Sequence, residues 1–282
     1  MSSSPLVPPS IPVGTGLSIF DPVFIGVDEF GHPVSLPLIY RNILIGGEPG
    51  AGKSSLLNTI VGHAALCYDV DLVLIDGKQV ELGLWKDCAD VFVGPDLDHA
   101  IDTLERLQVV RNNRSDYLLS QRRQKIERDD TFRPILLAID ELAFFSATVG
   151  TKTEQEYFSA LNRDIAARGR AFGVIDASAT QRPSSDIIPT SLRFLFAWRF
   201  AGRCVDDSSS DVVLGFGWAA RGYTAARIDL DNRGEGLLLA HGGMPAPIKG
   251  AFMSNADIIR VADYAAWIRR NRGDTDPALR VA

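Results

Sequence analysis

The chain has 282 residues, 46% of them hydrophobic and 23% charged, with a formal net charge of −6 at pH 7. This length suits one large domain or two small ones, and the hydrophobic content is ample for a core. No run of 18 apolar residues occurs in the sequence, which excludes a membrane-spanning helix. The negative net charge argues against a surface that is basic all over, but it allows a local basic track for nucleic acid.

The ends of the chain and its cysteines indicate the compartment and the extent of the folded unit. The first 20 residues are rich in Ser and Pro and lack the basic and apolar regions of a signal peptide, so 1–20 is predicted to be a disordered lead-in. One folded unit is expected over 21–270, followed by a polar, frayed tail over 271–282. Cys67, Cys88 and Cys204 lack metal-ligand spacing and indicate free thiols in a reducing cytoplasm.

Apolar strands alternate with helices over the first two thirds of the chain, which predicts an α/β fold with a parallel sheet and helices on both faces. The predicted strands lie at 24–27, 34–38, 43–45, 70–76, 90–94, 135–139 and 173–178. The predicted helices begin at 55, run from 96 to about 129, and run from about 153 to 170. The last third is predicted to add strands at 194–200, 225–228, 236–239 and 248–252, and a closing helix that starts at a capping box over 254–257.

The pattern G-x-x-x-x-G-K-S at 47–54 directly follows the strand predicted at 43–45. A strand, this loop and a helix form a P-loop, in which the helix N-terminus and backbone N–H groups converge on a phosphate. We expect Lys53 to bind the β- and γ-phosphates and the Ser54 hydroxyl to bind Mg²⁺. The predicted nucleotide-binding residues are Gly47, Glu48, Pro49, Gly50, Ala51, Gly52, Lys53, Ser54 and Ser55. A chance match in a glycine-rich loop is the alternative, which the flanking strand and helix disfavour.

Asp140 and Glu141 follow the apolar strand predicted at 135–139. We expect Asp140 to hold Mg²⁺, directly or through water, and Glu141 to polarise the attacking water as general base. Acids are also favoured at helix N-termini, so the pair alone is ambiguous, but a P-loop upstream favours the catalytic interpretation. The Glu directly after the Asp, and the absence of an Asn-Lys-x-Asp guanine signature, indicate hydrolysis of ATP.

Polar residues also follow the strand predicted at 173–178, where a side chain beside the P-loop strand can contact the γ-phosphate and sense its loss. Gln181 is the first candidate for this role and Thr180 is the second. A simple polar turn that Pro183 ends explains these residues equally well.

These motifs together resemble the FtsK/SpoIIIE family of double-stranded DNA translocases over 25–269. The stretch 76–82 is similar to the family's Asp-Pro-Lys…Glu-Leu stretch, with Gly77 in place of Pro, and 139–142 is similar to its Walker B motif. The stretch 179–183 reads Ala-Thr-Gln-Arg-Pro, as in the family, and 249–252 resembles its closing Gly-Ala-Phe strand. A P-loop alone would be weak support, whereas Ala-Thr-Gln-Arg-Pro at this distance from the acid pair is much more specific.

The resemblance implies a RecA-like P-loop ATPase that uses ATP and Mg²⁺ and assembles as a homo-oligomeric, hexameric ring around duplex DNA. Arg170 matches the family's arginine finger, which acts on the neighbouring subunit's site and can change the rate by about 10³–10⁵. Arg168 is the second candidate, and a cation favoured by a helix C-terminus is the alternative. The pore-facing basic residues of the family match Arg193, Arg199 and Arg203, although the spacing after 203 departs from the family's.

Large members carry a membrane anchor and a C-terminal winged-helix module, and neither is expected here. A short motor of this kind is similar to the Tra proteins of mycelial actinobacteria, which transfer double-stranded plasmid DNA between cells. We expect DNA transfer of this type, or chromosome segregation, with a membrane or loading partner that recruits a cytoplasmic ring. A type VII-like protein-secretion ATPase and a non-motor ATP-binding module are the alternatives. The intact set of Lys53, Ser54, Asp140 and Glu141 disfavours the second of these.

Overall fold

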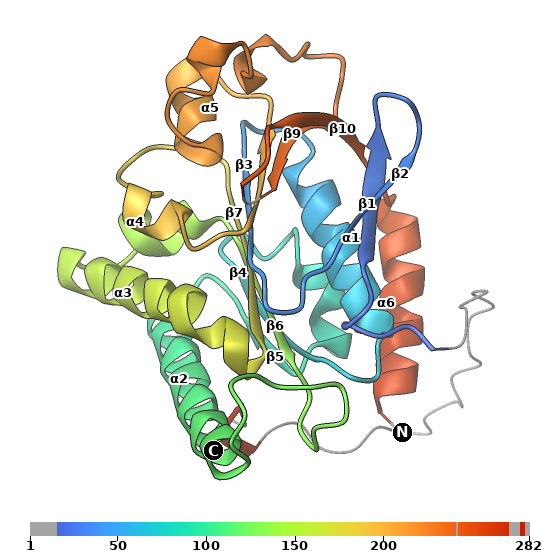
Figure 1. Cartoon of the computed structure of the whole chain (residues 1–282), viewed down its shortest axis with the longest axis vertical. Helices are drawn as coiled ribbons and strands as arrows, with labels where there is room; N and C mark the ends of the chain where they lie inside the picture. Colours follow the sequence, from blue (N-terminus) through green and yellow to red (C-terminus); the bar gives the residue numbers. More distant parts are fainter. Residues whose placement is uncertain (1–15, 241, 271–276, 280–282) are drawn as a thin grey trace.

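The structure is a computed structural model that describes residues 16–240, 242–270 and 277–279. Within these residues one sheet of ten strands has the order β2-β1-β10-β9-β8-β3-β7-β6-β4-β5 (Figure 1). The strands are β1 (Val23–Asp28), β2 (Pro33–Leu36), β3 (Ile43–Gly46), β4 (Asp71–Asp76), β5 (Val91–Val93), β6 (Ile135–Asp140), β7 (Val174–Thr180), β8 (Trp198–Gly202), β9 (Glu235–Ala240) and β10 (Ala246–Gly250).

The sheet has a parallel half and an antiparallel half. Strands β8, β3, β7, β6, β4 and β5 pair in parallel, whereas β9, β10, β1 and β2 pair antiparallel. Every residue of β3, β4, β6 and β7 is buried, as expected for parallel strands that are covered on both faces. The predicted fold class, an α/β P-loop ATPase fold with a mainly parallel sheet, is therefore confirmed.

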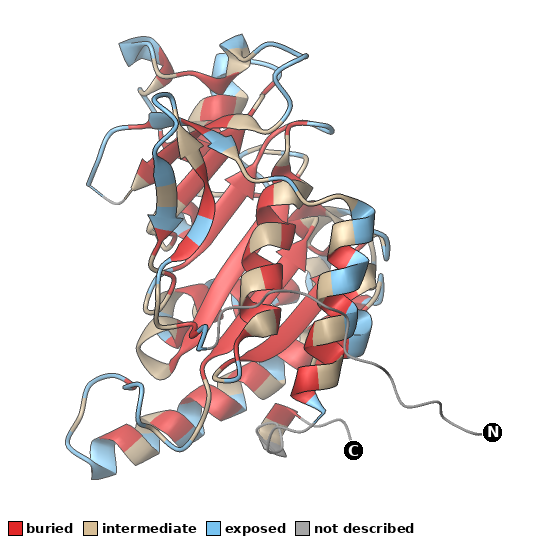
Figure 2. Cartoon of the chain, turned by 90° about the vertical axis from the view of Figure 1, so that its right-hand side faces the viewer, coloured by how far each residue is buried: buried red, intermediate tan, exposed pale blue. Residues whose placement is uncertain are grey.

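Helices cover the two faces of the sheet. They are α1 (Lys53–Leu66), α2 (Leu97–Ser120), α3 (Lys152–Arg168), α4 (Thr190–Arg193), α5 (Asp207–Leu214) and α6 (Asn255–Arg269). The short turns are η1 (Gly83–Cys88), η2 (Phe144–Thr148), η3 (Gly169–Phe172), η4 (Ala219–Arg221), η5 (Ala225–Arg227) and η6 (Pro277–Leu279). One apolar cluster joins α1 and α6 to the sheet, and a second joins α2, α3 and α5 to the other face (Figure 1). Figure 2 shows buried strands beneath helices with exposed outer faces.

The capping box predicted at 254–257 is confirmed. The Ser254 hydroxyl accepts the backbone N–H of Asp257, and the Asp257 carboxylate accepts the N–H of Ser254. No helix in the described parts of the chain is both long and apolar enough to cross a bilayer.

The long helix predicted to reach residue 129 is wrong at its end, because α2 stops at Ser120. Arg122 takes a left-handed conformation with φ 54°, and the Arg123 N–H donates to the Leu118 carbonyl at 2.9 Å. This arrangement closes a helix in the way that a glycine usually does. Arg123 then pairs with Asp130, so the segment 121–130 folds back instead of extending the helix.

Two strands predicted in the last third are also corrected. The segment predicted as a strand at 225–228 is the 3-10 turn η5, because the Ala225 N–H donates to Ser210 of α5 and the Thr224 hydroxyl accepts from Ala226. The strand predicted at 194–200 begins only at Trp198, because the preceding residues belong to the helical turn α4 and its C-terminal bend.

The predicted lead-in and tail fall mostly outside the described residues, but each has a described residue that is packed. Ile19 is fully buried, and its N–H donates to the Asp69 carboxylate at 3.0 Å. Leu279 is also buried and belongs to the apolar cluster of α2. The folded unit therefore includes residues at both ends that were predicted to be unstructured.

Candidate functional site

The topology of the sheet places the sequence motifs at the carboxyl ends of the parallel strands. Gly46 of β3 pairs with Thr180 of β7, and Asp140 of β6 pairs with Asp76 of β4. Because these strands are parallel, their carboxyl ends meet at the same end of the sheet, where α/β proteins form their binding crevices. The P-loop, the acid pair and the candidate sensor residues are therefore neighbours, as the sequence predicts.

The P-loop connects β3 to α1 through glycines in left-handed conformations. Gly50 has φ 80° and Gly52, which is the N-cap of α1, has φ 90°. A Cβ atom on Gly52 would lie 2.4 Å from the Cα of Gly234, which precedes β9. Only glycine allows the loop to pack this closely under the turn at 234, and it leaves the first backbone N–H groups of α1 facing the pocket.

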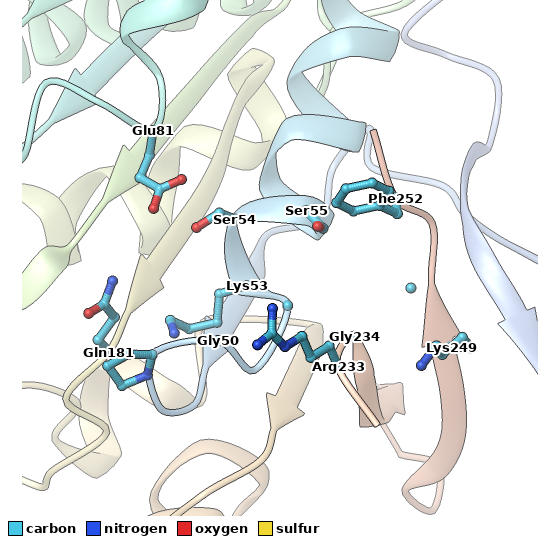
Figure 3. A pocket seen from close by; sticks show the side chains of 13 residues that line it. Gly50, Lys53, Ser54, Ser55, Glu81, Gln181, Arg233, Gly234, Lys249 and Phe252 are labelled. Carbon is cyan, nitrogen blue, oxygen red and sulfur yellow. The ribbon is translucent and has the colours of Figure 1, made fainter. Parts of the chain in front are cut away.

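Lys53 is 4% exposed, and its ammonium group donates to the Glu48 carbonyl at 2.7 Å. Burial lowers the pKa of Lys53 to about 8, although the nearby Glu141 carboxylate opposes this shift. A nucleotide phosphate would add negative charge beside this amine and favour its charged form. Lys53, Ser54 and Ser55 line a pocket of about 590 Å³ (Figure 3).

Asp140 ends β6 and is 3% exposed. Burial raises the pKa of its carboxyl group to about 7, and Lys78 opposes the rise. Its Oδ2 atom is buried and has no hydrogen-bond partner among the described residues. A free carboxylate oxygen and the Ser54 hydroxyl are hard oxygen ligands that fit Mg²⁺. The described residues hold no cluster of three or more His, Cys, Asp or Glu suited to a metal.

Glu141 is constrained by its backbone conformation and by its side-chain partners. Its φ of 62° is left-handed, which is uncommon for a non-glycine residue and occurs often at functional sites. Its carboxylate accepts hydrogen bonds from the Thr180 hydroxyl at 2.9 Å and from the Gln181 N–H at 3.2 Å. The Lys78 ammonium lies 3.4 Å from its Oε2 atom. The carboxylate is therefore held in one orientation by groups from the ends of β7 and β4, the two strands that neighbour β6.

Asp76 explains how Lys78 reaches Glu141. The fully buried Asp76 carboxylate accepts four backbone N–H groups, and their donors are Lys78, Gln79, Leu82 and Gly83. A carboxylate with this many N–H donors fixes the loop 77–83 tightly. The loop carries Lys78 to Glu141 and Glu81 to the pocket wall.

Gln181 and Thr180, the two candidate sensor residues, occupy different positions in the structure. The Gln181 side chain lines the pocket at the same end as Glu81 and Lys53 (Figure 3). The Thr180 hydroxyl is bonded to Glu141. A sensor role for Gln181 stays a prediction, whereas Thr180 orients the carboxylate predicted to be the general base.

Arg170 lies near the amino ends of the parallel strands, at the opposite end of the strands from the P-loop. It lines a hollow with Arg41, which precedes β3, and Ala197, which precedes β8, and both mark the amino ends of these strands. Since the P-loop follows the carboxyl end of β3, Arg170 does not contribute to the phosphate site of its own chain. Its predicted role as an arginine finger stays a prediction that requires a second subunit. Arg168 pairs with Asp164.

The expectation that Arg193, Arg199 and Arg203 line a DNA channel is not supported. Arg193 donates to the Val212 carbonyl at 3.2 Å and Arg199 to the Leu214 carbonyl at 2.6 Å. Both are buried, and they satisfy carbonyls at the C-terminal end of α5, where cations are favoured. Arg203 forms an ion pair with Glu48 of the P-loop. All three stabilise the fold around the nucleotide site.

Sequence reasoning missed several residues that line the pocket. They are Glu81, Arg233, Gly234, Lys249, Gly250 and Phe252. Glu81, Lys249, Gly250 and Phe252 lie in stretches that resemble the family, so a signal for them existed, although it carried no role. Arg233 lies in the turn before β9, about 180 residues from the P-loop, and no local motif identifies it.

The fold and the site define a P-loop ATPase of the α/β class. The FtsK/SpoIIIE family model matches residues 8–146. The "DNA translocase FtsK" of Staphylococcus aureus is 27% identical over 264 residues, an alignment that covers 86% of this chain and 32% of that protein. These matches support an FtsK/SpoIIIE motor domain. The chain spans about a third of the length of this curated relative.

Two solved structures share the fold. The pCW3 conjugation coupling protein TcpA, in its monomer form with ATPγS, has a TM-score of 0.74 and 20% identity, and the match covers 87% of this chain and 70% of TcpA. The cytoplasmic domain of the type VII secretion ATPase EccC of Thermomonospora curvata has a TM-score of 0.72 and 19% identity, and the match covers 99% of this chain and 34% of EccC. At these identities the likeness concerns the fold alone.

Proposed function

We propose that this chain hydrolyses ATP and uses the energy to move double-stranded DNA. The observation that carries the proposal is the set of groups around Glu141, where Thr180, Gln181 and Lys78 orient one carboxylate at the edge that holds the P-loop. A chain that only bound nucleotide would not need an oriented base with a strained backbone. Similarity to a DNA translocase supports duplex DNA as the track on which the motor would act.

The residues of the site have distinct tasks in this reaction. The N–H groups of the P-loop and the Lys53 ammonium bind the phosphates, and Ser54 and Asp140 would hold Mg²⁺, which neutralises charge on the β- and γ-phosphates. Glu141 orients the attacking water and accepts its proton. Gln181 contacts the γ-phosphate and registers its departure. The Gln181 N–H donates to Glu141, and Gln181 directly follows β7. A movement of Gln181 on phosphate release would therefore be passed to Glu141 and to β7.

The motor is proposed to work as a homo-oligomeric ring, with a hexamer as the expected form. Arg170 lies at the edge opposite its own P-loop, so it can serve an ATP site only on a neighbouring subunit. Within this proposal the ring is cytoplasmic, and a membrane or loading partner recruits it. The transferred DNA is proposed to be a plasmid or integrative conjugative element, with chromosome segregation as the alternative.

A type VII-like secretion ATPase is the second candidate function, and the match of 99% of this chain to EccC favours it. The two candidates differ in the track, which is duplex DNA for the first and a secreted protein for the second. The response of hydrolysis to DNA therefore separates them.

The test is the steady-state ATPase rate of purified protein with and without linear duplex DNA. A Glu141→Gln variant serves as the blank and Lys53→Ala as the variant that loses the phosphate charge partner. We expect strong stimulation by duplex DNA that high salt abolishes, because phosphate contacts release counterions with a slope of about −0.9 per contact. A rate indifferent to DNA would contradict the DNA motor, and normal hydrolysis by Lys53→Ala would contradict the P-loop assignment.

A further inference from the structure

We propose that the nucleoside of the bound nucleotide lies against a wall formed by the residues at 233–234 and 249–252, with its base stacked on the ring of Phe252. This inference rests on the proposed function, because it assumes that the P-loop binds a nucleoside triphosphate. It assigns the half of the pocket that the motifs leave without a role.

The first step is the direction of the nucleotide in the pocket. Gln181, Glu81 and Lys53 lie together at one end, beside the oriented Glu141 (Figure 3). The γ-phosphate must lie at this end, because Glu141, the predicted general base, and Gln181, the predicted sensor, act on it. The triphosphate then passes Ser54 and Ser55 at the start of α1, so the nucleoside leaves the P-loop on the Ser55 side. Phe252 and Ser55 both line the pocket, and Figure 3 draws them on the same side of it.

The second step is the state of the Phe252 ring. Its side chain is 78% exposed and lines the pocket, whereas the next residue, Met253, lies against Gly62 of α1. Backbone contacts fix this alternation, because the Ala251 N–H donates to the Ile25 carbonyl at 2.8 Å and Ser254 caps α6. The ring is therefore held out over the pocket by its own backbone. An aromatic face held in this way can accept a flat base without a conformational change.

The third step is the fixed distance between this wall and the phosphate cradle. A Cβ on Gly52 of the P-loop would meet Gly234 at 2.4 Å, and the Gly250 N–H donates to the Gly234 carbonyl at 2.8 Å. The P-loop, the turn before β9 and the end of β10 therefore form one packed stack. The phosphate-binding and base-binding ends of the pocket are held in register by these backbone contacts.

The polar groups of the wall fit the same assignment. Arg233 and Lys249 are exposed and line the pocket, and neither forms an ion pair with a carboxylate within the described residues. Figure 3 shows Arg233 reaching over the P-loop towards Lys53. Both side chains are donors only, which suits phosphate and ribose oxygens. Recognition of the base itself would then come from stacking, which accepts any large flat base.

The test compares two probes, ATPγS and inorganic tripolyphosphate, by calorimetric titration of the full chain. The two share a chain of three phosphate groups, but only ATPγS carries a base. Replacing Phe252 by Ala should raise the Kd for ATPγS about 5- to 150-fold, the range that corresponds to stacking strengths of about 1–3 kcal/mol. The Kd for tripolyphosphate should not change, and Phe252→Trp should restore the affinity for ATPγS. Phe30→Ala, at another exposed phenylalanine in the β1–β2 turn, is the matched control.

Three outcomes would overturn the proposal, and each differs from a failure of the proposed function. Phe252→Ala could bind ATPγS as tightly as Phe30→Ala does, it could weaken both probes equally, or Phe252→Trp could fail to restore binding. In all three cases wild-type protein still binds ATPγS and Lys53→Ala still binds both probes less tightly. If wild-type protein binds neither probe, or Lys53→Ala binds as the wild type does, the nucleotide site itself is refuted.

Discussion

Two groups of charged side chains in this protein differ in where their partners lie. Lys53, Lys78 and Glu141 stand at the carboxyl ends of the parallel strands and interact with one another, and Lys53 lines the pocket. Arg193 and Arg199 are buried beside α5 and donate to its last carbonyl groups. The first group has charge available for a ligand, whereas the interactions of the second are satisfied inside the fold. Whether a charged residue serves the site or the fold therefore depends on where its partners lie. The residue type alone does not reveal this.

The comparison predicts that changes in the first group alter chemistry and changes in the second alter stability. The largest effect is expected for Glu141→Gln, because a general base contributes about 10²- to 10⁴-fold to a rate. Hydrolysis should fall by this factor while ATPγS binding persists, since the amide keeps the shape of the side chain. Single-turnover hydrolysis and titration with ATPγS measure the two quantities. The control is Glu29→Gln, an exposed carboxylate in the β1–β2 turn, and equal rates for the two variants would remove Glu141 from the mechanism.

Asp176 extends the comparison to a carboxylate with internal partners only. It is fully buried in β7, and it accepts hydrogen bonds from Ser178 and Asn162. Burial raises the pKa of its carboxyl group to about 7, although both hydrogen bonds oppose the rise. An unfolded Asp has a pKa of about 3.9, so between these values the folded chain binds more protons and stability falls as the pH rises.

Asp176→Asn should remove this part of the pH dependence. The free energy of unfolding of the wild type should fall relative to that of the variant between pH 4 and pH 7, by at most about 4 kcal/mol for three pKa units. Urea unfolding at pH 5 and pH 8 measures the difference between the two proteins, in which the contribution of Asp140 cancels. Parallel pH profiles would show that Asp176 does not carry the expected proton. The hydrolysis rate per folded molecule should stay unchanged.

Arg199→Met tests the inward-facing group directly. The variant leaves the Leu214 carbonyl without its donor, so the free energy of unfolding should fall by about 1–3 kcal/mol. The dependence of duplex-DNA affinity on salt should not change. A DNA-contacting arginine would instead reduce the slope by about 0.9 for each phosphate lost. Arg227→Met, at an exposed arginine in η5, is the matched control for the loss of one positive charge. A reduced slope for Arg199→Met alone would restore the DNA-binding interpretation.

The sequence was sufficient for the parts of the fold and site that local chemistry determines. Buried parallel strands appear in the sequence as short apolar runs, and the P-loop carries its glycines at fixed spacing. The capping box at 254–257 marks the start of α6. Asp140 and Glu141 were recognisable because a strand end places adjacent acids at the edge of the sheet. Each of these signals lies within a few residues of the structure that it specifies.

The remainder depended on contacts between distant segments. The end of α2 was missed because Arg122 takes the left-handed position that usually requires glycine, and its sequence carries no stop signal. The 3-10 turn η5 forms because α5 supplies its hydrogen-bond partner. Arg193 and Arg199 were assigned to DNA because their carbonyl partners lie on a helix that comes later in the chain. Arg233 reaches the pocket only because β9 returns to the P-loop side of the sheet.

The smallest predicted effect concerns Lys78, whose ammonium group is partly exposed and lies 3.4 Å from the Glu141 carboxylate. Lys78 lowers the pKa of Asp140 against the effect of burial, so Lys78→Met should raise that pKa further. The acidic limb of the hydrolysis profile should then move to higher pH by at most about one unit, because solvent screens part of the interaction. The measurement is kcat/KM for ATP between pH 5.5 and 8.5, with Lys86→Met of the same segment as control. An unshifted acidic limb with an unchanged rate would place Lys78 with the inward-facing charges, whose only task is to support the fold.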